Sequence, residues 1–237
     1  MQALQTIKKI SSENLPPILV LSGDDIGQFE WMKEQLLKKV GYDSSDLNYS
    51  YFDMKETAYS EVELDLVSLP FFADKKIVIL DHFVDVTTAK KRYLTDDELQ
   101  SVEGYLSAPL ETTRLIVIAE GKLDSKRRIV KLLKRDAQLL EATELKEQEL
   151  RAHFAEEIKS LGLAIDSQAF DQLLIKSGFD FSEIQKNLEF LKNYKGSSSI
   201  IISDIEEAIP KTLQDNLFDL IQMILKKEID PARSLVK

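Results

Sequence analysis

Short apolar runs alternate with segments of helical periodicity from Ile18 to Glu141. Each run ends at turn or charged residues after a few positions, as Ile18-Leu19-Val20-Leu21 does at Ser22-Gly23, so the runs predict buried strands. The expected strands occupy residues 18–21, 47–52, 77–80, 115–118 and 138–141. Because strands that alternate with helices form parallel sheets, we predict an α/β domain with helices on both faces of its sheet.

Polar residues mark where several of the intervening helices are expected to begin. Ser60 and Glu63 have the spacing of a capping box, which predicts a helix over residues 61–68. In the same way, Asp124 or Ser125 is expected to cap the helix that follows the fourth strand.

Beyond Glu144 the strand-like runs give way to helical patterns over residues 146–161, 167–177 and 182–194. Glycines separate these segments, as they do at helix ends. We therefore expect a small all-helical second domain.

The last part of the chain begins a further helical pattern. Asp230-Pro231 is a strong helix start, yet only six residues follow it. Because a helix of about two turns is marginal in water, we expect the natural protein to continue. The predicted domains are 1–142 (α/β), 143–211 (helical) and 212–237 (the start of a third, helical domain).

Composition excludes several kinds of site. The 237 residues include no cysteine and only two histidines, His82 and His153, so thiolate and histidine-rich metal sites are excluded. We expect no metal and no cofactor. The net charge of −10 does not favour a free-standing nucleic-acid binder. No apolar run approaches the roughly 20 residues that span a bilayer, and Met1–Ile10 lacks the apolar centre of a signal peptide, so a cytoplasmic location is expected.

The turn after the first strand lies where nucleotide-binding proteins hold phosphates. A phosphate loop needs G-x-x-x-x-G-K-[ST], but Gly23 and Gly27 are too close together and neither Lys nor Ser/Thr follows Gly27. Asp24 and Asp25 would repel phosphate. Nucleotide binding is therefore not expected, and Asp81, after the third strand, is interpreted as a strand-end cap rather than a magnesium ligand.

A basic cluster lies on the helix expected before the fifth strand. It consists of Lys126, Arg127, Arg128, Lys131, Lys134 and Arg135. A solvated basic face is the favoured interpretation, and a contact with DNA or a partner protein is the alternative.

The segment from Leu69 to Lys76, with sequence LPFFADKK, is the most unusual local feature. Pro70 ends the preceding helix, and Phe71 and Phe72 follow it directly. Neighbouring side chains in an extended segment point in different directions, so both rings can hardly face one core. An exposed aromatic pair at a loop tip is typical of a partner-binding hot spot.

In this context the chain resembles the delta subunit family of the bacterial DNA polymerase III clamp loader. The resemblance rests on residues 68–80, 18–24, 123–128 with 131–134, and 216–220. It implies an AAA+-like first domain without a phosphate loop, a helical lid domain, and the start of a helical collar domain. It also implies no catalysis by the chain itself, which would be part of the DNA-directed DNA polymerase holoenzyme, a transferase complex.

The resemblance implies partners and a binding site as well. The partners are the β sliding clamp, which the subunit binds and opens during DNA replication, and other clamp-loader subunits, held through the collar. DNA would be met only within the assembled complex, and no membrane is involved. Phe71 and Phe72 would enter an apolar pocket of the ring, Leu69 and Pro70 would fix the tip, and Lys75 or Lys76 would meet acidic groups around that pocket.

Three other hypotheses about the function stay open. One is a delta-prime-like loader subunit, although that family is expected to carry a Ser-Arg-Cys motif and this chain has no cysteine. The second is a nucleotide-dependent AAA+ switch, which the missing phosphate loop argues against. The third is a nucleic-acid-binding adaptor that uses the basic helix, which strong, salt-sensitive duplex binding would support.

Overall fold

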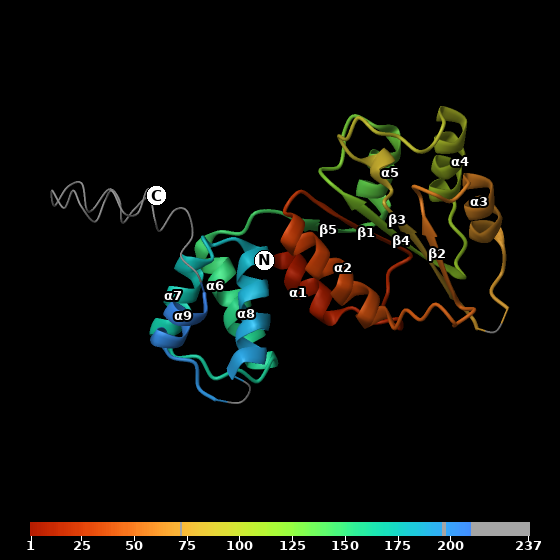
Figure 1. Ribbon diagram of the computed structural model, residues 1–237. Coiled ribbons are helices and arrows are strands. Elements are labelled where there is room, and N and C mark those ends of the chain that lie inside the picture. The colour runs from red at the N-terminus through yellow and green to blue at the C-terminus, as the bar shows by residue number, and fades with distance from the viewer. Residues whose placement is uncertain (72, 196–197, 210–237) are drawn as a thin grey trace. The chain divides into compact units, whose positions relative to one another are not determined.

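The computed structural model describes residues 1–71, 73–195 and 198–209 (Figure 1). The chain divides into two compact units, Met1–Glu144 and Leu145–Lys237, and each is described by itself. In the described parts of the chain, no helix is both long enough and apolar enough to cross a membrane.

The first unit is built on a five-stranded parallel sheet with the strand order β2-β3-β4-β1-β5. The strands are β1 (Ile18–Gly23), β2 (Tyr49–Asp53), β3 (Lys76–Asp81), β4 (Thr113–Glu120) and β5 (Gln138–Ala142). Every position of β1 and β3 is buried, which explains the apolar runs Ile18–Leu21 and Ile77–Leu80 within them. The α/β fold class predicted from the alternating pattern is confirmed.

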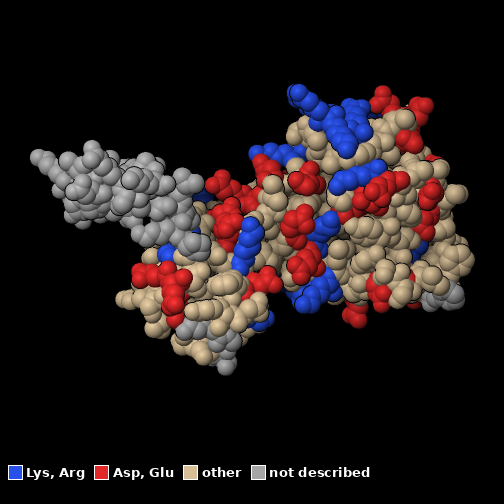
Figure 2. Space-filling view, in the orientation of Figure 1, with Lys and Arg blue, Asp and Glu red and all other residues tan. Residues whose placement is uncertain are grey.

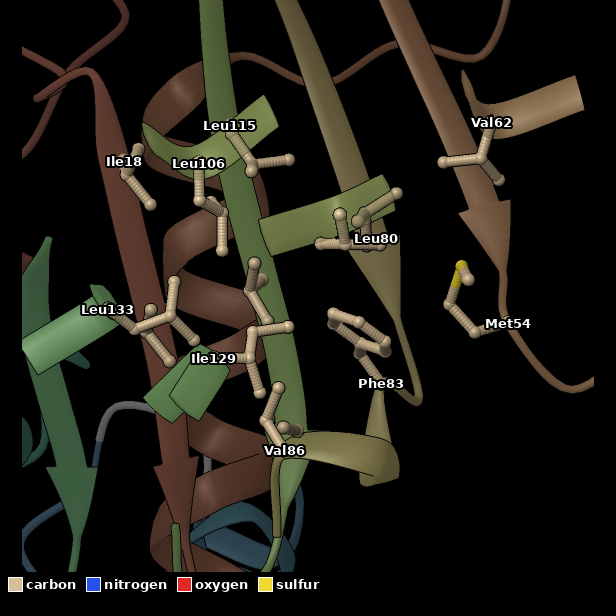
Figure 3. Close-up of a cluster of buried hydrophobic side chains, with 14 of the residues drawn as sticks. Ile18, Met54, Val62, Leu80, Phe83, Val86, Leu106, Leu115, Ile129 and Leu133 are labelled. Carbon is tan, nitrogen blue, oxygen red and sulfur yellow. The ribbon is translucent and has the colours of Figure 1, made fainter. Parts of the chain in front are cut away.

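Helices cover both faces of this sheet. They are α1 (Gln2–Lys9), α2 (Ile26–Val40), α3 (Tyr59–Val67), α4 (Asp96–Ser107) and α5 (Arg128–Asp136), with a short 3-10 helix η1 (Val84–Val86) after β3. One face packs against α3, α4 and α5 around a core that includes Val62, Leu106 and Ile129 (Figure 3). α1 and α2 pack on the other face, toward which β1 turns alternate side chains.

Two helix starts differ from the prediction. α3 begins at Tyr59, after Ala58, so Ser60 lies inside the helix, and the Glu63 carboxylate accepts a hydrogen bond from Ser101 of α4. The Glu63 carboxylate, which a capping box would need, is thus bonded to another helix instead.

The helix after β4 begins at Arg128, later than expected. Asp124 accepts a hydrogen bond from the Lys126 amide at 3.1 Å and so stabilises a turn before α5 rather than its first residue. The helix α1 was not predicted at all.

The second unit contains α6 (Glu147–Ser160), α7 (Ser167–Lys176), α8 (Phe181–Lys195) and α9 (Ile202–Ala208) in its described part. His153 is fully buried and its ring stacks on Phe181 at 5.1 Å, beside Phe154, so it belongs to an aromatic core. The expected three-domain division stays a prediction, and its third part, 212–237, lies outside the described residues.

Candidate partner-binding tip

The helix α3 buries one side and exposes hydrophobic side chains on the other. Tyr59, Val62 and Leu66 are buried against the sheet, whereas Leu64 is 70% exposed and Val67 58% exposed. The helix ends at Val67. Ser68, the next residue, has an extended backbone, and Pro70 two residues later cannot continue the helix.

The loop after α3 carries exposed hydrophobic side chains to its tip. Leu69 is 67% exposed, Phe71 is 85% exposed, and Pro70 between them is partly exposed. Phe72, the other aromatic residue predicted for this site, lies outside the described residues. In Figure 1 the loop runs along the edge of the first unit next to β2 and β3.

Lys76, the first residue of β3, connects the end of this loop to the end of α3, where the loop begins. Its side chain is buried, and its ammonium donates to the Ser68 hydroxyl at 2.7 Å and to the Asp65 carbonyl in the last turn of α3. The Asp65 carboxylate lies 3.4 Å away. A cation is favoured at a helix C-terminus, where unpaired carbonyls gather. The loop from Leu69 to Lys75 is therefore closed at its base, and only Lys75, not Lys76, is exposed for contact with an acidic partner.

The turn after β1 is filled by the protein's own backbone. The amides of Asp24 and Asp25 both donate to the Ala142 carbonyl at the end of β5, at 3.1 and 3.3 Å. The Asp25 carboxylate caps α2 by accepting from the Gln28 amide at 2.9 Å. Gly23 has φ +141°, and a Cβ there would lie 2.0 Å from the Ala142 oxygen. The amides that a phosphate loop would present are thus already bonded.

Asp81, at the end of β3, is buried in a polar network. Its carboxylate accepts from Lys33 of α2 at 2.6 Å, from the Tyr51 hydroxyl, and from the His82 amide at 2.8 Å. Burial raises the pKa of Asp81, but the hydrogen bonds from Lys33 and Tyr51 outweigh it and hold that pKa below its usual value. Burial, followed by the bond to Asp81, raises the pKa of Tyr51. The cation beside Asp81 is therefore a lysine from the chain itself.

The arginines of the predicted basic cluster are largely engaged within the first unit. Arg127 donates to the Asp85 carbonyl and to Asp124, and Arg128 pairs with Glu103 of α4 at 3.3 Å. With Arg92, these arginines line an open groove that also contains acidic side chains. Figure 2 shows Lys and Arg gathered at the top of the first unit. This mixed surface fits a solvated face better than a continuous phosphate-binding one.

The sequence did not lead us to predict that Leu64 and Val67 are exposed or that Lys76 is buried. Leu64 and Val67 are apolar but lie off the stripe of Tyr59, Val62 and Leu66, a departure that can be read from the sequence. Nothing in the sequence distinguishes the buried Lys76 from its exposed neighbour Lys75, because burial depends on where α3 ends. Within the described residues, no cluster of three or more His, Cys, Asp or Glu side chains could hold a metal ion.

Comparison with solved structures defines the class of fold. The chain is similar to a Bacillus subtilis DNA clamp loader delta protein, with a TM-score of 0.69 and 22% identity over 99% of this chain and 69% of that one. It is also similar to a RuvB variant from Thermotoga maritima, with a TM-score of 0.51 and 9% identity over 80% of this chain and 60% of that one. The first unit is thus an AAA+-like α/β domain.

Sequence comparison gives the family. The model of the family described as DNA polymerase III, delta subunit, matches residues 19–143, more than half of the chain. The chain therefore belongs to the DNA polymerase III delta subunit family, which confirms the resemblance. It is 23% identical over 224 residues to the DNA polymerase III subunit delta of Bacillus subtilis strain 168, covering 93% of this chain and 65% of that relative's length.

Proposed function

We propose that this chain is a clamp-loader subunit that binds the β sliding clamp and opens it during DNA replication. Leu69, Pro70, Phe71 and Phe72 form the proposed contact. The observation that carries the proposal is the exposure of Phe71, a residue that is 85% exposed in a loop with an anchored base.

The exposed ring is physically suited to anchor a partner. Burying a phenylalanine side chain contributes about 2–3 kcal/mol, and a few such residues supply most of the binding energy of an interface. The ammonium of Lys76 holds the loop base against α3, so less conformational entropy is lost when the tip binds. Family membership and the clamp loader named in the Bacillus subtilis structure support the ring as the partner.

The proposed action is mechanical rather than chemical. The tip binds more tightly to a ring subunit whose shape no longer closes the ring, so binding shifts the population of rings toward the open form. The size of the shift equals the difference in binding free energy between the two ring states. Other loader subunits would be held through the collar, and DNA would be met only in the assembled complex.

The decisive experiment is calorimetric titration of this chain with the sliding clamp of its own organism. The Phe71→Ala/Phe72→Ala variant should lose more than about 2 kcal/mol of binding free energy, roughly a thirtyfold weaker Kd. Phe190→Ala, which removes an exposed ring from the second unit, is the matched control and should bind as the parent does.

Other results would point elsewhere. Equal binding by the parent and the double variant would remove the tip from the proposal while keeping the ring as partner. No binding of the ring by the parent would overturn the proposal, and tight, salt-sensitive binding of duplex DNA would then favour the nucleic-acid adaptor. Heat on titration with ATP would favour the nucleotide-dependent switch.

A further inference from the structure

The groove that Arg92, Arg127 and Arg128 line lies between α4 and α5, two helices that pack against each other. Its volume is about 320 Å³, which falls within the roughly 300–1,000 Å³ of ligand-binding sites. Residues of the loop tip do not line it. The function proposed for the tip therefore leaves this groove without a role.

Two of the residues that line the groove are apolar. Ile129 is almost fully buried in the core of the first unit (Figure 3), and Leu99 of α4 packs against the same core while it stays partly exposed. An apolar side chain of a ligand would cover Leu99 and remove its surface from water, which is favourable.

Two of the three guanidinium groups are held by exposed ion pairs. Arg92 pairs with Asp96 at 3.2 Å, and 48% and 92% of the two side chains are exposed. Arg128, whose side chain is 76% exposed, pairs with Glu103 at 3.3 Å. Exposed pairs contribute little to stability, so either guanidinium can exchange its partner for a carboxylate of a bound molecule at small cost.

Arg127 forms a fixed wall of the groove. Its guanidinium donates to the Asp85 carbonyl in η1 and to the Asp124 carboxylate at 3.3 Å, and 17% of its side chain is exposed. Partners from two parts of the chain hold it, so it keeps its place when a ligand binds. Arg127 therefore gives the site its shape, whereas Arg92 and Arg128 supply charges that can be redirected.

The acidic residues of the groove distinguish between two classes of anionic ligand. A nucleic acid presents a continuous row of phosphates, which Asp96 and Glu103 would repel. A peptide presents one carboxylate with apolar side chains beside it, and arginine binds a planar carboxylate through two parallel hydrogen bonds. A peptide can thus bond to a guanidinium and cover Leu99 without placing further negative charge in the groove.

We propose that the groove between α4 and α5 is a docking site for a peptide segment of another protein, in which an acidic residue stands next to a large apolar one. Arg92 and Arg128 bind the carboxylate, and Leu99 receives the apolar side chain. This inference does not depend on the function proposed for the loop tip.

The probe is the acetylated and amidated tripeptide Leu-Glu-Leu, titrated to millimolar concentrations into the protein. The methyl NMR signals of Leu99 and Ile129 should shift and saturate. The matched tripeptide Leu-Gln-Leu has the same shape without the charge, and it should bind at least about fivefold more weakly, because the ion pair to arginine is lost.

Arg92→Gln/Arg128→Gln removes both redirectable charges. This variant should bind Leu-Glu-Leu at least about fivefold more weakly than the parent does, with the melting temperature and the Kd of Leu-Gln-Leu unchanged. Arg135→Gln is the matched control, because Arg135 is an exposed arginine in the last turn of the same helix α5. Its Kd for Leu-Glu-Leu should match that of the parent.

Three results would overturn the proposal. They are the lack of a saturating shift at Leu99 and Ile129 with Leu-Glu-Leu, equal binding of the two tripeptides by the parent, and a shift of the same signals by duplex DNA but not by the peptide. The last result would favour a contact with phosphates instead. The comparison of the two tripeptides uses the parent alone, so it decides the proposal even if the double variant unfolds.

Discussion

At the scale of single residues, Lys76 shows what spacing alone cannot predict. The sequence offers two adjacent lysines, and either could face a partner. The structure buries Lys76 under the last turn of α3, where its ammonium replaces water as the donor to carbonyl and hydroxyl oxygens. A buried lysine is tolerated only with such partners. Lys76 is therefore part of the support of the tip rather than of its contact surface.

Lys76→Met keeps the aliphatic stem and removes the ammonium. We expect a loss of about 1–3 kcal/mol in the free energy of unfolding, because the Asp65 carbonyl and the Ser68 hydroxyl lose their donor. Clamp binding should also weaken severalfold, since the loop base is released. Urea denaturation and calorimetry measure the two effects. The control is Lys75→Met, which should unfold as the parent does, and parent-like stability of Lys76→Met would disprove the supporting role.

At the scale of elements, the apolar runs and helical stripes predicted all five strands and most helices, because burial on a sheet repeats along the chain. The starts of α3 and α5 were less predictable. Ser60 and Asp124 are good capping residues, but the Glu63 carboxylate accepts from Ser101 of α4, and Asp124 accepts from the Lys126 amide in a local turn. Local capping propensity gives way to a partner from another part of the chain in the first case and to a competing turn in the second.

The turn between β1 and α2 gives a prediction about two glycines. Gly23→Ala should lower the free energy of unfolding by about 3 kcal/mol or more, because its Cβ would collide with the Ala142 carbonyl and its φ is +141°. Gly104→Ala is the matched change, in α4 with nothing within 4 Å of the new Cβ. It should stabilise the protein by about 0.5–1 kcal/mol. Thermal unfolding of both variants tests the pair. A Gly23→Ala variant as stable as the parent would contradict the close approach of Gly23 to the Ala142 carbonyl.

At the scale of the whole molecule, family membership and the AAA+-like class could be predicted from sequence, because they depend on patterns spread over the chain. The candidate tip could be proposed from sequence too, because Phe71 stands out through its aromatic neighbour and Pro70. The exposure of Leu64 and Val67 could not, because it depends on the direction of each α3 side chain. The collar expected at residues 212–237 lies outside the described residues and stays a prediction.

The acid stability of the first unit should depend on Asp81. Its pKa is lowered in the folded protein, so its contribution is present above the ordinary value of 3.8 and is lost as pH falls through the lowered pKa. Asp81→Asn should cost about 2–3 kcal/mol at neutral pH, because the charge of Lys33 loses its partner. The difference from the parent should shrink in strong acid. Denaturation curves from neutral to acid pH measure this, with the exposed Asp74→Asn as a nearly neutral control, and a difference that is constant with pH would contradict it.

The closed turn after β1 also decides what it would take to build a nucleotide site into this chain. It would not be enough to place a lysine after Gly27, because the Ala142 carbonyl would still occupy the amides of Asp24 and Asp25. The end of β5 would have to move as well, and β5 pairs with β1 along four residues. Single substitutions in the turn would therefore not create a phosphate site, because the backbone of β5 would still occupy it.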